Sequence, residues 1–514
     1  MTSLISKRSS AAGTKVGELP DEPKPDDPEP DDPEPDDPKP LEPQPTLTSA
    51  PYTGTSTSTS TSTITVSLSS ATASSAPLIP YVVVTEELTR EAGTALQDRM
   101  KPYVMGPIDA NLREDEQGTQ TMVFRFNTMA TLAKELELLH DTDIAWIFPE
   151  SDVGYDEDEP STPGRATSPP LGPGPELASQ GVFYDPGADA SLKALSQPAD
   201  YASYDPNDMY GYAYPTSSGK GITIYIIDTG ANPTHEEYAG SPGLKRWMYV
   251  AKNTFQSDSD TKRGHGSCVQ SLVNGPRFGA AKGADIVIVK LPDPFTTSDI
   301  ITALYWVTDD IAKRSLEGKA VVTMSVYTVG VDIAKSKAFG IQVLKDGWDA
   351  TAESMRDQME LLIYLDVPVV VASENDRQEY EHIDGFPAAF AKELDIIAVG
   401  AMKSNGARAS YSQGDIDEVT VLAMGEVECA RTDSTWETRH TFGTSFAAPR
   451  VAGMIATWLS SEKYRERLQV KGKVAANVKN LLKELAYVKM PASEVDGGFP
   501  PNFYKLAVYN SHRI

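Results

Sequence analysis

The chain has 514 residues and a formal net charge of −27, because 73 Asp and Glu outweigh 46 Lys and Arg. That length allows two or three domains, one of them large enough for a deep apolar core. The acidic balance disfavours a nucleic-acid-binding surface, and no apolar run approaches the ~18 residues of a membrane span. We therefore expect neither nucleic acid nor a membrane among its partners.

The first part of the chain has the composition of a disordered region. Residues 20–45 contain a repeat of proline and acidic residues, and residues 52–76 contain a Ser/Thr tract. Proline removes amide donors and the acidic side chains repel one another, so such a segment stays extended and solvated. We predict that residues 1–78 are disordered.

A small domain is predicted over residues 79–151. Its apolar residues alternate in strand-like segments and recur at helical spacing between them. This pattern indicates a compact α+β unit of ferredoxin-like type, and residues 152–204, rich in Pro, Gly and acids, have the composition of a linker. The predicted order is strand 81–85, helix 87–100, strand 121–127, helix 131–140 and strand 144–151.

Residues 205–514 alternate short, continuously apolar, β-branched strands with helices. Strands of this kind are buried on both faces, as in a parallel sheet. We predict an α/β domain with a doubly wound parallel sheet. Its predicted strands are 222–227, 284–291, 320–326, 368–373 and 396–401, and its predicted helices are 297–314, 351–365 and 446–459.

Polar residues in four places of this domain are candidates for a site. Asp228 ends the first strand in "IIDTG", and Asn375 follows another strand in "SEND". Functional side chains gather at such carboxyl ends, although either residue taken singly is most often a turn residue. His265 lies between glycines in "GHGS", and Ser445 starts the helix "GTSFAAPRVAG". Taken singly, these two read as an ordinary histidine and a capping serine.

Together the four residues supply every role that a nucleophilic serine needs. A serine attacks at neutral pH only if a base takes its proton, a carboxylate orients that base and donors stabilise the oxyanion. The chain order Asp…His…Ser differs from the order Ser…Asp…His of α/β-hydrolases, whose nucleophile motif reads G-x-S-x-G. The α/β-hydrolase interpretation therefore fails.

The motifs "IIDTG", "GHGS" and "GTSFAAPRVAG" closely resemble the three catalytic motifs of the subtilisin-like serine peptidases, the subtilases. "SEND" is similar to the oxyanion segment of that family, and "GFPAAF" followed by "IIAVGA" is similar to the stretch after it. The resemblance spans about residues 205–460 and implies a serine endopeptidase. It implies that Asp228 orients His265 and that His265 deprotonates Ser445. Asn375 and the Ser445 amide would then bind the oxyanion.

The small domain resembles the inhibitory prosegment of the same family by position and pattern. Such a prosegment assists folding and occupies the cleft until it is cleaved; an unrelated accessory domain is the alternative. The resemblance further implies protein or peptide substrates, a monomer and no required cofactor. Calcium commonly stabilises the family, and Glu237 in "HEEYAG" falls near a position that can supply a ligand. Because an exposed loop glutamate is the favoured interpretation of Glu237, we assign no metal site.

The cellular compartment stays open. The family resemblance suggests an extracellular or vacuolar protein, but the N-terminus lacks the apolar core of a secretory signal and the chain has no Asn-x-Ser/Thr acceptor. These features favour a protein that stays inside the cell, or a sequence that does not begin at the true start.

Cys268 and Cys429 form no disulfide framework and cannot hold zinc alone, and the sequence does not decide whether they pair.

Several positions depart from the family pattern around the substrate. Ser325, Val326 and Tyr327 stand where the family usually has Ser-Leu-Gly, and Glu374 stands where it usually has glycine before the oxyanion asparagine. Cys268 replaces a frequent histidine. These changes keep a second hypothesis open, a catalytically impaired pseudoenzyme that binds peptides without cutting them.

Glu374 itself has two interpretations. Its carboxylate could face the specificity pocket and pair with a substrate Lys or Arg, or it could point to solvent. The solvent orientation is favoured, because a buried carboxylate without a partner is costly when no substrate is bound.

Overall fold

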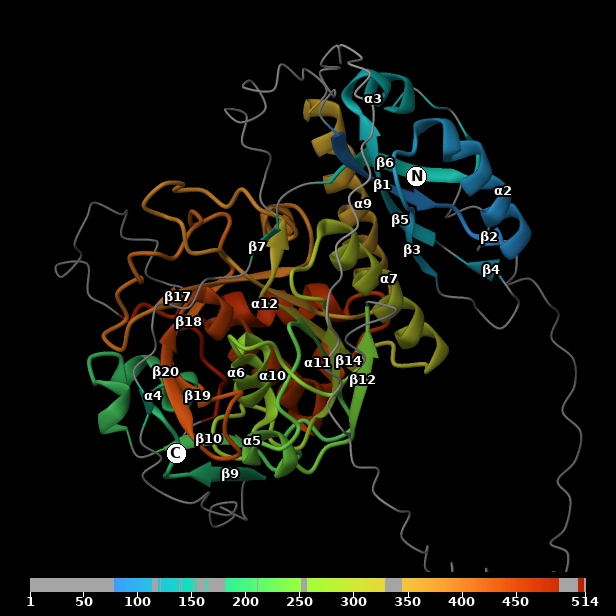
Figure 1. Cartoon of the computed structure of the whole chain (residues 1–514). Helices are drawn as coiled ribbons and strands as arrows, with labels where there is room; N and C mark the ends of the chain where they lie inside the picture. Colours follow the sequence, from blue (N-terminus) through green and yellow to red (C-terminus); the bar gives the residue numbers. More distant parts are fainter. Residues whose placement is uncertain are drawn as a thin grey trace, which may run out of the picture. The chain divides into compact units, whose positions relative to one another are not determined.

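Figure 1 shows the computed structural model of the chain. Ser74–Ile514 form one compact unit. The predicted disordered region, apart from Leu78, and most of the predicted linker before residue 181 lie outside the described residues. The structure describes residues 78–112, 119–120, 122–137, 139, 141–150, 153–154, 163–164, 181–209, 211–250, 257–328, 344–489 and 507–512.

A seven-stranded sheet forms the centre of the larger domain, and every paired neighbour in it runs parallel. Along the central strand β11, Ile224 and Ile226 enter one apolar core and Tyr225 and Ile227 the other. Burial on both faces explains the continuously apolar strand sequences. In spatial order the strands are β12 (Lys245–Tyr249), β13 (Asp285–Lys290), β11 (Thr223–Asp228), β14 (Ala320–Met324), β16 (Val369–Ala372), β17 (Ile397–Met402) and β18 (Val421–Met424).

Helices cover both faces of this sheet, as the doubly wound prediction requires. The two edge strands, β12 and β18, were not predicted; β12 carries charged residues and stays half-buried, so it lacks the apolar signal of the inner strands. One core contains side chains of α6 (His265–Asn274), α10 (Thr444–Ser460), α11 (Glu462–Leu468) and α12 (Val474–Leu485), and the other contains those of α7 (Thr297–Lys313) and α9 (Leu344–Tyr364).

The small domain has a four-stranded antiparallel sheet in the order β3-β5-β1-β6. Alternation along β1 places Tyr81 and Val83 in the domain's own core, whereas Val82 and Val84 join the core that contains α7 and α9. The sequence predicts one strand too few, because β3 is short and polar. The elements are β1 (Leu78–Thr85), α2 (Arg90–Met100), β3 (Asp109–Leu112), β5 (Met122–Met129), α3 (Ala130–Glu137) and β6 (Ile144–Pro149).

The C-terminal part of the predicted linker is ordered. Strand β9 (Val182–Asp185) pairs with β10 (Tyr212–Pro215), and Leu192 and Leu195 of α4 (Ala190–Leu195) are buried in the core beside β11. The larger domain therefore begins before residue 205. The segment "ASLKAL" forms a helix too short to produce a clear periodic signal, and the Asp189 carboxylate caps it by accepting from the Leu192 N–H.

Short strands complete the larger domain. β19 (Glu426–Ala430) and β20 (Thr438–Phe442) form a hairpin that leads directly into α10. β15 (Tyr327–Thr328) pairs with β7 (Val153–Gly154), and β20 pairs with β8 (Pro163–Gly164). Within the described ranges, none of the helices has the length and apolar character needed to cross a membrane.

Candidate active site

Asp228 is the last residue of β11, at the point where the strand order of the sheet reverses. β11 lies between β13 and β14, and both follow it in the chain but lie on opposite sides of it. Open α/β sheets hold their ligands outside such a point. The Asp228 side chain is fully buried, and its Oδ1 accepts a hydrogen bond from the Thr229 N–H at 2.7 Å.

His265 is the first residue of α6 and is also fully buried. Gly264 precedes it in the left-handed region with φ 70°, a conformation that favours glycine. The His265 Nδ1 lies 2.8 Å from the Asp228 Oδ1. A proton on Nδ1 satisfies both groups, so the arrangement favours the tautomer whose Nε2 is the basic nitrogen.

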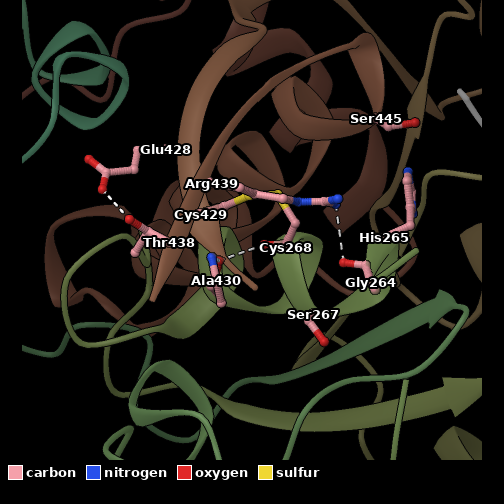
Figure 2. The surroundings of a disulfide bond; sticks show 12 residues. Gly264, His265, Ser267, Cys268, Glu428, Cys429, Ala430, Thr438, Arg439 and Ser445 are labelled. Carbon is pink, nitrogen blue, oxygen red and sulfur yellow. Dashed lines mark hydrogen bonds between the residues drawn. A yellow bond between two sulfur atoms is a disulfide. The ribbon is translucent and has the colours of Figure 1, made fainter. Parts of the chain in front are cut away.

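Ser445 is the second residue of α10, and only 1% of it is exposed. Its hydroxyl donates to the Ser325 carbonyl oxygen at 3.4 Å, while the Ser325 hydroxyl donates to the Ser445 carbonyl oxygen at 2.8 Å. In Figure 2 the Ser445 hydroxyl and the His265 ring face each other. The structure thus brings the predicted acid, base and nucleophile to one place.

Asn375 lies beyond the carboxyl end of β16, beside the start of α10. Its Oδ1 accepts from the Thr444 N–H at 3.0 Å, which directs the amide orientation and leaves the Nδ2 hydrogens available as donors. The first turn of a helix also offers N–H groups that have no partner within the helix. Asn375 and the N-terminus of α10 can therefore stabilise an oxyanion next to Ser445.

Asp260 is a site residue that sequence reasoning missed. Its Oδ1 accepts from the Thr229 hydroxyl at 2.7 Å, and its Oδ2 accepts from the Ser267 N–H and hydroxyl at 2.5 and 2.6 Å. It thereby links the residue after Asp228 to the first turn of α6, which His265 begins. Burial raises the pKa of Asp260, and Asp228 adds to the shift, although the hydrogen bonds from Ser267 and Thr229 oppose it. The available signal was the acidic run "SDSD" shortly before "GHGS".

The comparison with known families agrees with this geometry. A model of the subtilase family matches residues 219–494, more than half of the chain. The chain belongs to the subtilase family.

Several curated proteins are similar to this subtilase. Subtilisin-like protease 7 of Trichophyton equinum is 33% identical over 251 residues, which are 48% of this chain and 53% of that protein. Alkaline protease 1 of Emericella nidulans is 30% identical over 247 residues, 47% of this chain and 53% of that protein. Subtilisin-like protease 3 of Pseudogymnoascus destructans is 29% identical over 290 residues, 54% of this chain and 64% of that protein. The chain spans about half to two thirds of the length of these curated relatives.

A solved structure shares the fold. The epidermin leader peptide processing serine protease of Staphylococcus aureus aligns with a TM-score of 0.51 and 14% sequence identity over 84% of this chain and 96% of that one. At that identity the likeness shows the fold alone. The predicted subtilisin-like, doubly wound domain is confirmed.

Glu374 does not point to solvent in this subtilase, so the favoured interpretation was wrong. Only 2% of Glu374 is exposed, and its Oε1 accepts from the Gly385 N–H at 3.0 Å. Its φ of 70° explains why glycine suits the position. A hydrogen bond that only the folded chain supplies lowers the cost of burying the carboxylate.

The predicted substrate-binding strand lies next to Glu374. Ser325 and Val326 are buried, and Tyr327 is half-buried and pairs with Gly154. Thr328 exchanges backbone hydrogen bonds with Phe386, the residue after Gly385. The segment that carries Glu374 and Asn375 is therefore adjacent to β15.

Two further sequence questions are decided by the structure. Cys268 and Cys429 form a disulfide, with Cα atoms 5.0 Å apart and a sequence separation of 161. Glu237 is fully buried and pairs with Arg277 at 2.6 Å, so the exposed-loop interpretation was wrong. Among the residues that the structure describes, no group of three or more His, Cys, Asp or Glu is arranged to hold a metal ion. Stabilisation by calcium stays a prediction.

Proposed function

We propose that this subtilase is a serine endopeptidase that hydrolyses peptide bonds of protein or peptide substrates through Asp228, His265 and Ser445. The observation that carries the proposal is the buried Asp228–His265 hydrogen bond of 2.8 Å beside a serine at a helix N-terminus. A buried carboxylate orients the imidazole and stabilises the imidazolium that forms during the reaction.

The reaction follows from the roles of these groups. The Ser445 Oγ attacks the carbonyl carbon of the scissile bond while the His265 Nε2 takes the hydroxyl proton. The negative charge on the former carbonyl oxygen is stabilised by the Asn375 Nδ2 and the Ser445 N–H. His265 then gives the proton to the leaving amine, and a water molecule, activated by His265 in the same way, hydrolyses the acyl-enzyme.

A fluorophosphonate probe tests this proposal directly, because it reacts with an activated serine. The wild type should be labelled and should cut a protein substrate, and Ser445→Ala should do neither. Ser257→Ala, which changes an exposed serine, serves as the matched control and should behave as the wild type. A folded wild type that binds peptides but is neither labelled nor active would favour the pseudoenzyme instead.

We further propose that the small domain is a prosegment and that the enzyme is made as a self-inhibited precursor. The Glu150 Oε1 accepts from the Ser298 N–H in the first turn of α7, and the Trp146 indole donates to Asp357 of α9. After the small domain, Val153 and Gly154 pair as an antiparallel strand with β15. An extended segment on the strand beside the candidate oxyanion site would compete with substrate.

Maturation tests the precursor hypothesis. The active wild type should lose everything before a cut between Gly154 and Gly181, because the chain from Val182 on is part of the larger domain. The Ser445→Ala chain, purified without other proteases, should stay at full length. An active wild type that remains uncut would instead favour an accessory domain. The mature enzyme is expected to sediment as a monomer.

Substrate preference is assigned to Glu374. Its side chain is buried, and its carboxylate accepts from the Gly385 N–H in the segment that contacts Thr328. A substrate Lys or Arg before the scissile bond could form a charge-assisted hydrogen bond with it. Such a bond contributes about 1.5–3 kcal/mol, which corresponds to about 10–150-fold in selectivity.

A further inference from the structure

The β19–β20 hairpin connects the two ends of the candidate site. Its second strand ends at Phe442, and α10 with Ser445 begins two residues later. The same hairpin contacts α6, which begins at His265. Its contacts fall on both sides of His265 in the sequence.

On the N-terminal side, the contact is made by Arg439 of β20. Its guanidinium donates to the Arg263 carbonyl oxygen at 2.9 Å and to the Gly264 carbonyl oxygen at 3.2 Å. Figure 2 shows the Arg439 side chain extended toward Gly264, the residue directly before His265. Arg439 is 8% exposed, and hydrogen bonds from a charged donor are stronger than those between neutral groups.

On the C-terminal side, the contacts come from β19. Cys429 is bonded to Cys268, one turn after His265 (Figure 2). The next residue of the strand, Ala430, donates its N–H to the Ser271 hydroxyl at 3.1 Å. The first two turns of α6 are therefore joined to the hairpin by one covalent bond and one hydrogen bond.

The register of the hairpin places the residues that make these contacts side by side. Cys429 and Arg439 are directly opposite each other in the antiparallel ladder, and opposite residues project to the same face of a sheet. Both side chains therefore reach α6 from one cross-strand pair. Neither contact involves Asp228 or Ser445 directly.

We propose that the Cys429–Arg439 pair of the hairpin positions His265 against Ser445. This inference rests on the proposed Asp-His-Ser function. Proton transfer needs the serine and the base within about 2.6–3.2 Å, and a misplacement of 1 Å can cost about 100-fold in rate. Because the hairpin continues into α10, a displacement of α10 with Ser445 would also displace α6 with His265. Arg439 is a positioning residue, since it contacts the backbone before the base and no reacting atom.

Steady-state kinetics of the mature enzyme test the proposal. In Arg439→Met, kcat should fall by about 10–100-fold while KM stays within about twofold, because substrate binding uses other groups. Arg439→Lys should recover part of kcat, since an ammonium can still donate to one of the two carbonyls. Arg431→Met is the matched control: Arg431 lies beside β19 but pairs with Asp433 and Glu437, and kcat should not change.

A second variant removes the disulfide, which is the other link between the hairpin and α6. Cys268→Ala combined with Cys429→Ala should itself lower kcat, and should lower it more in the Arg439→Met background than in the wild type, because each link alone restrains α6 only in part. The rate of fluorophosphonate labelling should follow kcat in every folded variant.

Two outcomes would overturn the proposal. One is a folded Arg439→Met enzyme with the kcat of Arg431→Met. The other is a loss that appears only in KM or only in thermal stability. If Arg439→Met does not fold, Arg439→Lys and the cysteine double variant give the same readouts. An unlabelled, inactive wild type would instead refute the proposed function, so the two failures are distinguishable.

Discussion

Helix α6 begins at His265 and helix α10 carries Ser445 as its second residue, but the two helices are held in different ways. α10 has 17 residues, of which all but the last are buried, and it packs against several strands of the central sheet. α6 has ten residues, and its start is held by side chains from elsewhere, namely Asp260, Arg439 and Cys429. Burial positions both helices, because all ten residues of α6 are buried as well, but the short helix with a polar start has in addition the specific contacts that hold its first turn.

The largest effect on turnover is expected beside the start of α10, where the Asn375 side chain contributes a donor and the packing of α10 fixes the position of Ser445. Asn375→Ala should leave the fold intact and lower turnover by about 10²–10³-fold, the range known for removal of such a donor from subtilisin. Fluorophosphonate labelling should slow but persist, and KM should change little. Turnover equal to that of the wild type would remove Asn375 from the oxyanion site.

The next effect concerns the contribution of the disulfide on α6 to the free energy of unfolding. Replacing Cys268 and Cys429 by alanine removes a covalent link between positions with a sequence separation of 161, and should lower the free energy of unfolding by about 2–4 kcal/mol. Denaturation in a Ser445→Ala background avoids self-digestion. A dithiol reductant should lower the stability of the Ser445→Ala parent toward that of the cysteine variant and leave the variant unchanged. Equal stabilities without reductant would argue against the disulfide.

Variants of Glu374 test whether the residue before Asn375 also sets substrate specificity. A peptide library varied only at the residue before the cut should show a preference for Lys and Arg of about 10–150-fold over uncharged residues of similar size. The preference should collapse in Glu374→Gly, which suits the positive φ of that position. Apolar preference in both proteins would refute the assignment.

The smallest effect is expected at Asp260, which contacts the first turn of α6, and it is a change of stability with pH whose sign can be predicted. Because burial raises the pKa of Asp260 in the folded state, its contribution to stability is fully present below the ordinary value of 3.8. That contribution is lost as the pH rises through the raised folded value. The free energy of unfolding of the parent minus that of Asp260→Asn should therefore fall as the pH increases from 3.8.

The measurement is denaturant unfolding over a pH series in the Ser445→Ala background. Asp417→Asn, which changes an exposed carboxylate, reports the effect of the charge change alone. A difference for Asp260→Asn that rises with pH would show that the carboxylate is stabilised as the anion.

The sequence alone was sufficient for the architecture and for the candidate triad. Five inner strands were predicted close to their observed bounds because continuous β-branched runs are a local consequence of burial on two faces. Asp228, His265 and Ser445 were found because strand ends, glycine pairs and helix starts also leave local patterns. The edge strand β12 and the helix α4 were missed where those local signals are weak.

Only the tertiary structure decided the contacts between distant segments. The burial of Glu374 depends on the Gly385 N–H, the pairing of Cys268 depends on a strand 161 residues away, and Arg439 reaches the residues before His265 from the far side of a hairpin. No periodicity encodes such contacts, because their free energy depends on which segments the folded sheet brings together. The sequence therefore determined which residues are available for the chemistry, and the packing of α6 against the hairpin determined how they are held.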